Sequence, residues 1–66
     1  MKLHEIAVHA VRTHNAVLAG KVAVTLRFKF GLNDNQVWEW VNAHETINRP
    51  AWESLMLDAD AEESQG

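Results

Sequence analysis

The clearest pattern in the chain is the alternation over residues 21–30, KVAVTLRFKF. Apolar side chains occupy every second position, and basic, hydroxylated or alanine side chains fall between them. The apolar positions are Val22, Val24, Leu26, Phe28 and Phe30. Because β-branched and aromatic residues at a period of two are typical of a half-buried strand, the sequence predicts a strand here with one apolar and one basic face.

Residues 3–19 show a different period. Their apolar side chains recur at the i, i+3, i+4, i+7 spacing of an amphipathic helix, and Gly20 stands where the left-handed residue after a helix belongs. The competing interpretation is a strand over residues 5–12 that forms a hairpin with residues 21–30. Alternation over residues 5–12 is poor, because their apolar side chains would fall on both faces of a strand, so a helix is favoured.

A further helix is predicted to begin after Asn33. Asn33 is a favourable N-cap, and Gln36 three residues later completes a capping box. The stripe expected to be buried consists of Val37, Trp40, Val41 and His44. Trp38 lies roughly 100° from the centre of that stripe. It is expected either to pack in the core or to contact another subunit or a partner, because aromatic residues are enriched at interface hot spots.

The last helix is predicted to run from about Pro50 to Ala59, because proline is favoured at the first position of a helix. Residues 1–58 are expected to form one small domain, and residues 59–66, ADAEESQG, have the polar and acidic composition of a disordered tail. Charge is divided unevenly along the chain. Residues 1–52 carry six basic and four acidic side chains, whereas residues 53–66 carry five acids and no base.

Composition narrows the class of protein. With 66 residues, a single core leaves little margin of stability, and the absence of cysteine excludes disulfides. Oligomerisation is therefore the expected additional source of stability. The lack of cysteine fits a reducing compartment, and the sequence shows neither a signal-peptide pattern nor an apolar run long enough to span a membrane. A cytoplasmic location is expected.

No pattern of residues indicates catalysis. His4 and His9 are five positions apart, about 140° on a helix, so they cannot chelate one metal as the i, i+4 histidines of a zinc protease do. No nucleophile has a histidine base in a supporting motif, and the glycines form no phosphate loop. The sequence therefore predicts a protein that is not an enzyme and has no cofactor and no metal site.

A lone strand raises a pairing problem. If residues 3–19 are helical, residues 21–30 form the only strand, and its backbone groups need a partner from another chain. A two-fold homodimer supplies that partner. The predicted fold class is therefore α+β, with an N-terminal helix, one strand and two short helices (α-β-α-α), and with the strand paired across a homodimer. The alternative is a monomeric β-hairpin followed by two helices.

Residues 21–59 resemble the ribbon-helix-helix family of DNA-binding proteins in the order and spacing of these elements. KVAVTLRFKF would be the ribbon, NDNQVWEWVNAHE the first helix and RPAWESLMLDA the second. The resemblance implies a dimer that lays an antiparallel ribbon in the major groove of duplex DNA, with outward ribbon residues on the bases and the start of the second helix on a phosphate. The residues so implied are Ala23, Thr25, Arg27, Lys29, Asn48 and Arg49.

Two functions follow as hypotheses. The first is a small dimeric DNA-binding regulator of transcription that uses this ribbon. The alternative is a small non-enzymatic protein-binding module, an inhibitor or adaptor of the kind encoded by mobile elements. It would act on a basic partner through Trp38 and the acidic C-terminus.

Overall fold

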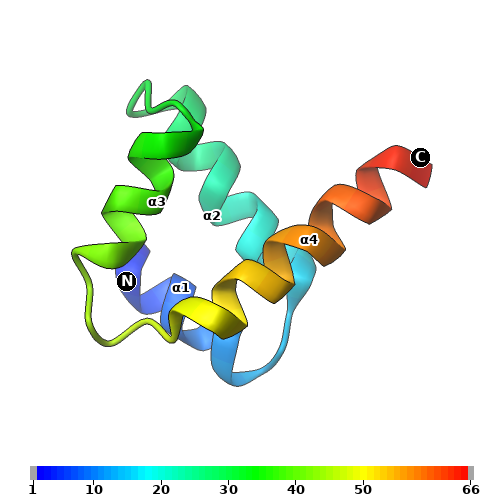
Figure 1. The fold of residues 1–66 in the computed structure, drawn as a ribbon, viewed down its shortest axis with the longest axis horizontal. Coiled ribbons are helices and arrows are strands. Elements are labelled where there is room, and N and C mark those ends of the chain that lie inside the picture. The colour runs from blue at the N-terminus through cyan, green and yellow to red at the C-terminus, as the bar shows by residue number, and fades with distance from the viewer. Residues whose placement is uncertain (1, 66) are drawn as a thin grey trace.

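A computed structural model describes residues 2–65, with side chains as far as residue 61. Within these residues the chain forms four helices and no strand (Figure 1). They are α1 (Leu3–Arg12), α2 (Ala16–Phe28), α3 (Asp34–Asn42) and α4 (Arg49–Gln65). The predicted α+β class is therefore wrong in both of its forms, since neither the intermolecular ribbon nor the alternative hairpin has a strand to build it.

The segment predicted as a strand lies mostly in α2. Its sequence also satisfies the helical period, because α2 buries one residue at each of the positions i, i+3, i+4 and i+7. These residues are Ala19, Val22, Ala23 and Leu26. A helix satisfies its backbone hydrogen bonds within one chain, whereas a lone strand cannot, and this advantage outweighs the exposure of apolar side chains on the other side of α2.

The helix predicted over residues 3–19 is divided by a turn. His14 adopts a left-handed backbone conformation with φ of 52°, which places a sharp reversal after α1. Asn15 then caps α2, since its Oδ1 accepts a hydrogen bond from the Leu18 N–H at 3.0 Å. Gly20, predicted to follow the end of a helix, lies inside α2. The turn lets α2 pack back against α1.

The prediction for α3 is confirmed. Asn33 and Gln36 form the capping box, with a hydrogen bond of 2.9 Å from each backbone N–H to the side chain of the other residue. Val37 and Val41 are buried in the core. The remaining two residues of the predicted stripe, Trp40 and His44, are half-buried.

Helix α4 starts close to the predicted residue and extends farther than predicted. Asn48 Oδ1 accepts a hydrogen bond from the Ala51 N–H at 3.2 Å, so Asn48 caps the helix. The helix continues to Gln65. Part of the predicted tail, residues 59–66, lies outside the described residues, namely Gly66 and the side chains of residues 62–65. The predicted boundary between the domain and the tail after residue 58 therefore stays a prediction.

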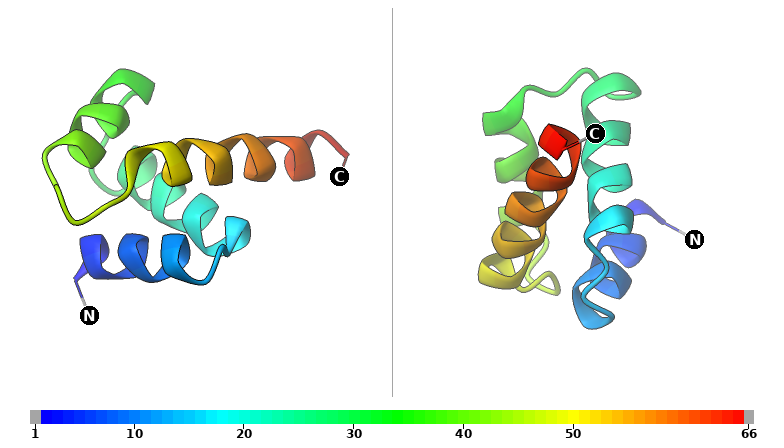
Figure 2. Two further views of the ribbon diagram at one scale, coloured as in Figure 1. Left: turned by 60° about the horizontal axis from the view of Figure 1, so that its bottom comes forward. Right: turned by 90° about the vertical axis from the view of Figure 1, so that its right-hand side faces the viewer.

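The core forms where α2 lies between α1 and α4, with α3 closing one end (Figure 2). Trp52 and Leu55 of α4 are fully buried against it, and small residues of α1, Ala7 and Ala10, allow the helices to approach closely. The Trp52 indole N–H has no hydrogen-bond partner among the described residues. The C-terminal end of α4 extends beyond the other helices (Figure 1). None of the helices described is both long and apolar enough to cross a membrane.

Candidate interaction surfaces

The residues implied as base contacts do not form an exposed row. Ala23 lies in the core with 2% of its surface exposed. The Thr25 hydroxyl donates a hydrogen bond to the Lys21 carbonyl oxygen at 2.8 Å, within α2. The Arg27 guanidinium pairs with the Asp34 carboxylate at 3.0 Å, which ties the end of α2 to the start of α3. The alternating face expected from a strand is therefore dispersed around a helix.

The other residues implied as DNA contacts lie apart from these. Lys29 follows the last turn of α2, with its Nζ 5.9 Å from the centroid of the Phe30 ring. Arg49 lies at the opposite end of the molecule, at the start of α4, and donates a hydrogen bond to Asn42 Oδ1 at 3.2 Å (Figure 1). Asn48 uses its side chain to cap α4. The structure thus does not bring the six residues together.

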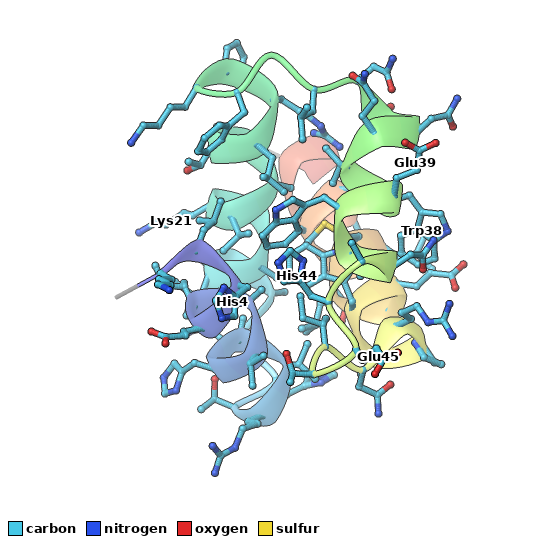
Figure 3. All side chains as sticks on the ribbon, turned by 90° about the vertical axis from the view of Figure 1, so that its left-hand side faces the viewer. His4, Lys21, Trp38, Glu39, His44 and Glu45 are labelled. Atoms are coloured by element: carbon cyan, nitrogen blue, oxygen red, sulfur yellow. The ribbon has the colours of Figure 1, made fainter. Side chains whose placement is uncertain are left out.

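Trp38 is exposed at the junction of α3 and α4. Its exposed fraction is 38%, and it lies beside the first turns of α4, where it lines an open depression. The other residues of that depression are Asn42, Arg49, Pro50 and Glu53. Figure 3 shows Trp38 and Glu39 on the outer side of α3, away from α1. The buried residues of α3 therefore hold the helix in an orientation that presents Trp38 outward.

The apolar surface continues from this depression along α4. Leu57 lies one helical turn after Glu53 and is 65% exposed. We call Trp38, Asn42, Arg49, Pro50, Glu53 and Leu57 the Trp38 surface. Glu53 within this surface and Glu39 beside it are acidic, and Arg49 is its one basic residue. The two large apolar side chains thus have two carboxylates and one guanidinium near them.

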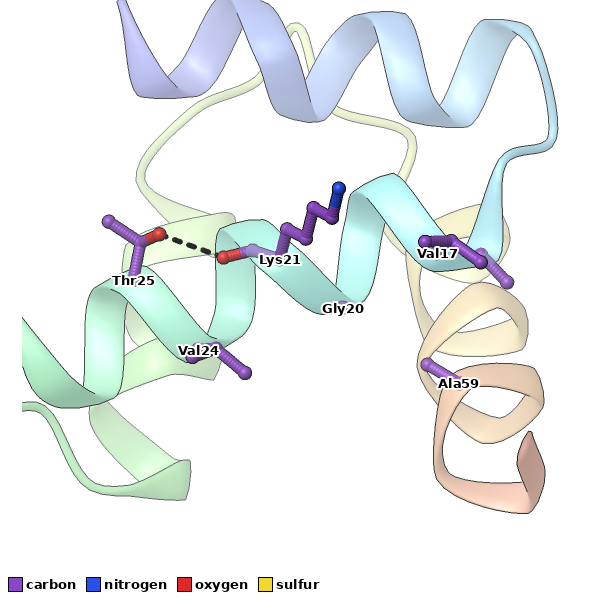
Figure 4. A pocket seen from close by; sticks show the side chains of 7 residues that line it. Val17, Gly20, Lys21, Val24, Thr25 and Ala59 are labelled. Carbon is purple, nitrogen blue, oxygen red and sulfur yellow. Dashed lines mark hydrogen bonds between the residues drawn. The ribbon is translucent and has the colours of Figure 1, made fainter. Parts of the chain in front are cut away.

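A second apolar surface covers the outer side of α2. Val17, Gly20, Val24 and Phe28 recur at i, i+3, i+7 and i+11, opposite the buried residues, and we call them the α2 outer stripe. Val17 is 55% exposed, Val24 40% and Phe28 84%. Figure 4 shows the open groove between this stripe and α4, with Lys21 and Thr25 on its rim and Ala59 on the α4 side.

Two histidines contribute to an aromatic cluster between α1 and the segment after α3 (Figure 3). The rings of His4 and His44 stack with centroids 5.2 Å apart, and the His44 ring lies 4.6 Å from that of Trp40. His44 Nδ1 also lies 2.8 Å from the Trp40 carbonyl oxygen. Among the described residues no group of three potential ligands could hold a metal ion, so this cluster is best explained by packing.

Comparison of the chain with protein-family models, curated proteins and solved structures finds no match. The resemblance to ribbon-helix-helix proteins is therefore not tested by any relative. The ribbon that it implied is absent from residues 21–28, which are helical.

Because the expected ribbon is absent, the candidate sites are the two exposed apolar surfaces, the Trp38 surface and the α2 outer stripe. Trp38 was identifiable from its position off the predicted stripe, whereas its place in one depression with Pro50 and Glu53 depends on how the chain brings the start of α4 near α3.

Proposed function

We propose that this chain is a small, non-enzymatic protein-binding module whose Trp38 surface engages a basic, amphipathic segment of another protein. The observation that carries the proposal is the exposure of Trp38 beside Pro50 and Glu53, on a surface that continues to Leu57. Single exposed apolar side chains are common, but tryptophan is enriched in binding hot spots, and here it lies in a depression with a polar rim.

Charge defines the class of partner. Glu53 lies inside the Trp38 surface and Glu39 lies beside it, so two carboxylates outnumber the one cation, Arg49, which donates a hydrogen bond to Asn42. A lysine- or arginine-rich segment with apolar side chains on one face would bury Trp38 and Leu57 and place its cations near these carboxylates. Such complementarity accelerates association and selects against acidic partners.

Recognition of DNA through a ribbon is not part of this proposal, because the residues of the expected ribbon form α2. The cations expected to contact DNA are separated in space, and Arg27 is already paired with Asp34. DNA binding through any other surface stays a prediction, which retention of duplex DNA at low salt would test.

The test uses a synthetic leucine–lysine amphipathic helical peptide as the probe, with isothermal titration calorimetry on the full chain. The Trp38→Ala substitution is expected to weaken binding about 30-fold, the change that corresponds to the roughly 2 kcal/mol of a hot-spot residue. Phe28→Ala is the matched control, since Phe28 is an exposed aromatic residue on the other surface, and it is expected to leave the affinity unchanged.

A leucine–glutamate peptide of the same length distinguishes recognition of charge from non-specific hydrophobic binding. It is expected not to bind. Equal affinity for the two peptides, or unchanged affinity in the Trp38→Ala variant, would contradict the proposal. Circular dichroism checks that the variant is folded. If Trp38→Ala proves unfolded, Leu57→Ala tests the same surface, because Leu57 is largely exposed and contributes little to the core.

A further inference from the structure

The stacked rings of His4 and His44 join two parts of the chain that have little other contact. His4 lies in the first turn of α1, and His44 lies two residues after the end of α3. Both helices pack against α2, but within the described residues α1 and α3 have no comparably extensive contact with each other. From this arrangement we infer that the stack is an acid-sensitive contact, which holds while at most one of the two rings is charged and opens when both are.

The contacts of His44 accommodate one positive charge. A carbonyl oxygen only accepts hydrogen bonds, so His44 Nδ1, 2.8 Å from the Trp40 carbonyl oxygen, carries a hydrogen and donates it. The Trp40 ring lies beside the same imidazole, with centroids 4.6 Å apart. Both contacts stay favourable when His44 is charged, because an imidazolium donates a stronger hydrogen bond and is attracted to an indole ring.

A second charge, on His4, has no such compensation. The two imidazole planes are inclined by only 14°, so two charged rings would face each other. At the centroid separation of 5.2 Å, Coulomb's law with the dielectric constant of water corresponds to about a fourfold change in an equilibrium constant. Half-burial of both rings makes the repulsion larger than it would be in water. Charging both rings therefore separates them.

The surrounding side chains do not cancel this repulsion. Charged or titratable groups around the rings come from four parts of the chain, namely Lys2, Glu5, His9 and Arg12 in and before α1, Lys29 after α2, Glu45 after α3 and Arg49 of α4. Within the described residues neither Glu5 nor Glu45 is ion-paired with an imidazole. The Glu5 carboxylate accepts instead from the Lys2 backbone N–H at 3.1 Å. From α3 itself, Asp34 pairs with Arg27, and Glu39 lies on the outer side of the helix (Figure 3).

Separation of the rings exposes apolar surface without unfolding the domain. The other residues of the depression that the two histidines line are Leu3, Leu26, Phe30, Leu32 and Trp40. Val37, Val41 and Ile47 are buried in the core, so they hold α3 and the segment after it in place when the stack opens. The inference does not rest on the proposed function, because Trp38 lies on the outer side of α3, away from α1 (Figure 3).

Nuclear magnetic resonance of the full chain between pH 8 and pH 5 tests this inference, because histidine is the side chain that ordinarily gains its charge in this range. Nuclear Overhauser contacts between the His4 and His44 rings are expected at pH 8 and are expected to disappear at pH 5. The titration curves of the two rings are expected to be coupled, so that replacing either ring changes the curve of the other.

His4→Phe separates the effect of charge from that of stacking, since phenylalanine keeps an aromatic ring that cannot be protonated. In the unfolded chain both histidines accept protons freely, so the repulsion lowers stability as the pH falls. Between pH 8 and pH 5 the unfolding equilibrium constant of the unmodified chain is therefore expected to rise at least about fourfold more than that of His4→Phe. His9→Phe is the matched control, because His9 is an exposed histidine of the same helix, and it is expected to keep the full response.

His44→Phe is the second variant, for the case that His4→Phe does not fold, and it is also expected to lose the acid response. Charging of His14 does not produce the response, because its Nε2 lies 4.0 Å from the Asp58 carboxylate and a charge there is attracted. Independent titration of the two rings, or ring contacts that persist at pH 5, overturns the inference. So does an acid response that both phenylalanine variants at the stack retain, or one that His9→Phe removes.

Discussion

Replacement of Gly20 by alanine tests one revision of the fold, the placement of this residue inside a helix and not after the end of one. If Gly20 followed the end of a helix in a left-handed conformation, alanine would be strained there and the protein would lose stability. In the structure Gly20 lies within α2, where alanine is favoured over glycine by about 0.5–1 kcal/mol. The two placements therefore predict effects of opposite sign.

The surroundings of Gly20 determine how much of this gain is retained. A Cβ atom added at Gly20 would lie 3.4 Å from the Cβ of Ala59, at the near limit of ordinary van der Waals contact. Little of the gain is then lost to crowding, and the free energy of unfolding is expected to rise by about 0.5–1 kcal/mol. For a domain of this size the melting temperature would rise by roughly 2–8 °C.

Thermal unfolding followed by far-ultraviolet circular dichroism measures this change, with the variant and the unmodified chain compared at the same protein concentration. Gly31→Ala is the matched control. Gly31 has φ of 68° and no atom within 4 Å of an added Cβ, so alanine there meets only backbone strain and is expected to cost about 1–2 kcal/mol. A lower melting temperature for Gly20→Ala would contradict the placement of Gly20 inside α2 with room for a Cβ atom beside Ala59.

Further substitutions test other features, each by chemical denaturation. Asn15→Ala removes the cap that accepts from the Leu18 N–H and is expected to lower stability by about 0.5–2 kcal/mol; no change would mean that α2 does not begin there. Trp52→Ala empties a fully buried position and is expected to cost about 3–5 kcal/mol, whereas a cost below about 1 kcal/mol would contradict its place in the core. Arg27→Ala breaks an exposed ion pair with Asp34 and is expected to change stability by less than about 1 kcal/mol, so a larger loss would show that the pair is not an ordinary surface contact.

The parts of the fold that could be predicted from the sequence are those determined by neighbouring residues. The capping box of Asn33 and Gln36 fixes the start of α3 through contacts within four residues, and the prediction was correct. Proline at position 50 similarly indicated the start of the last helix, although the helix begins at Arg49. Such signals depend little on the rest of the chain.

The error at residues 21–30 has a physical cause. Val22 and Leu26 are apolar positions of both the strand and the helix pattern, so periodicity alone does not distinguish the two. The local signal that favours a helix is Asn15, which lies three residues before Leu18. Its side chain accepts a hydrogen bond from the Leu18 N–H and so caps the start of α2. Exposure of Val17 and Phe28 could not be predicted, because it depends on which side of α2 is covered by α1 and α4.

Over residues 2–65 the regular backbone hydrogen bonds lie within helices of one chain, and this has a consequence for how the protein folds. An intermolecular ribbon would make folding bimolecular, so that dilution would slow it. Helices α1 to α4 form from contacts within one chain, and helical domains rich in local contacts fold in microseconds to milliseconds. Each chain is therefore expected to refold at a rate independent of protein concentration.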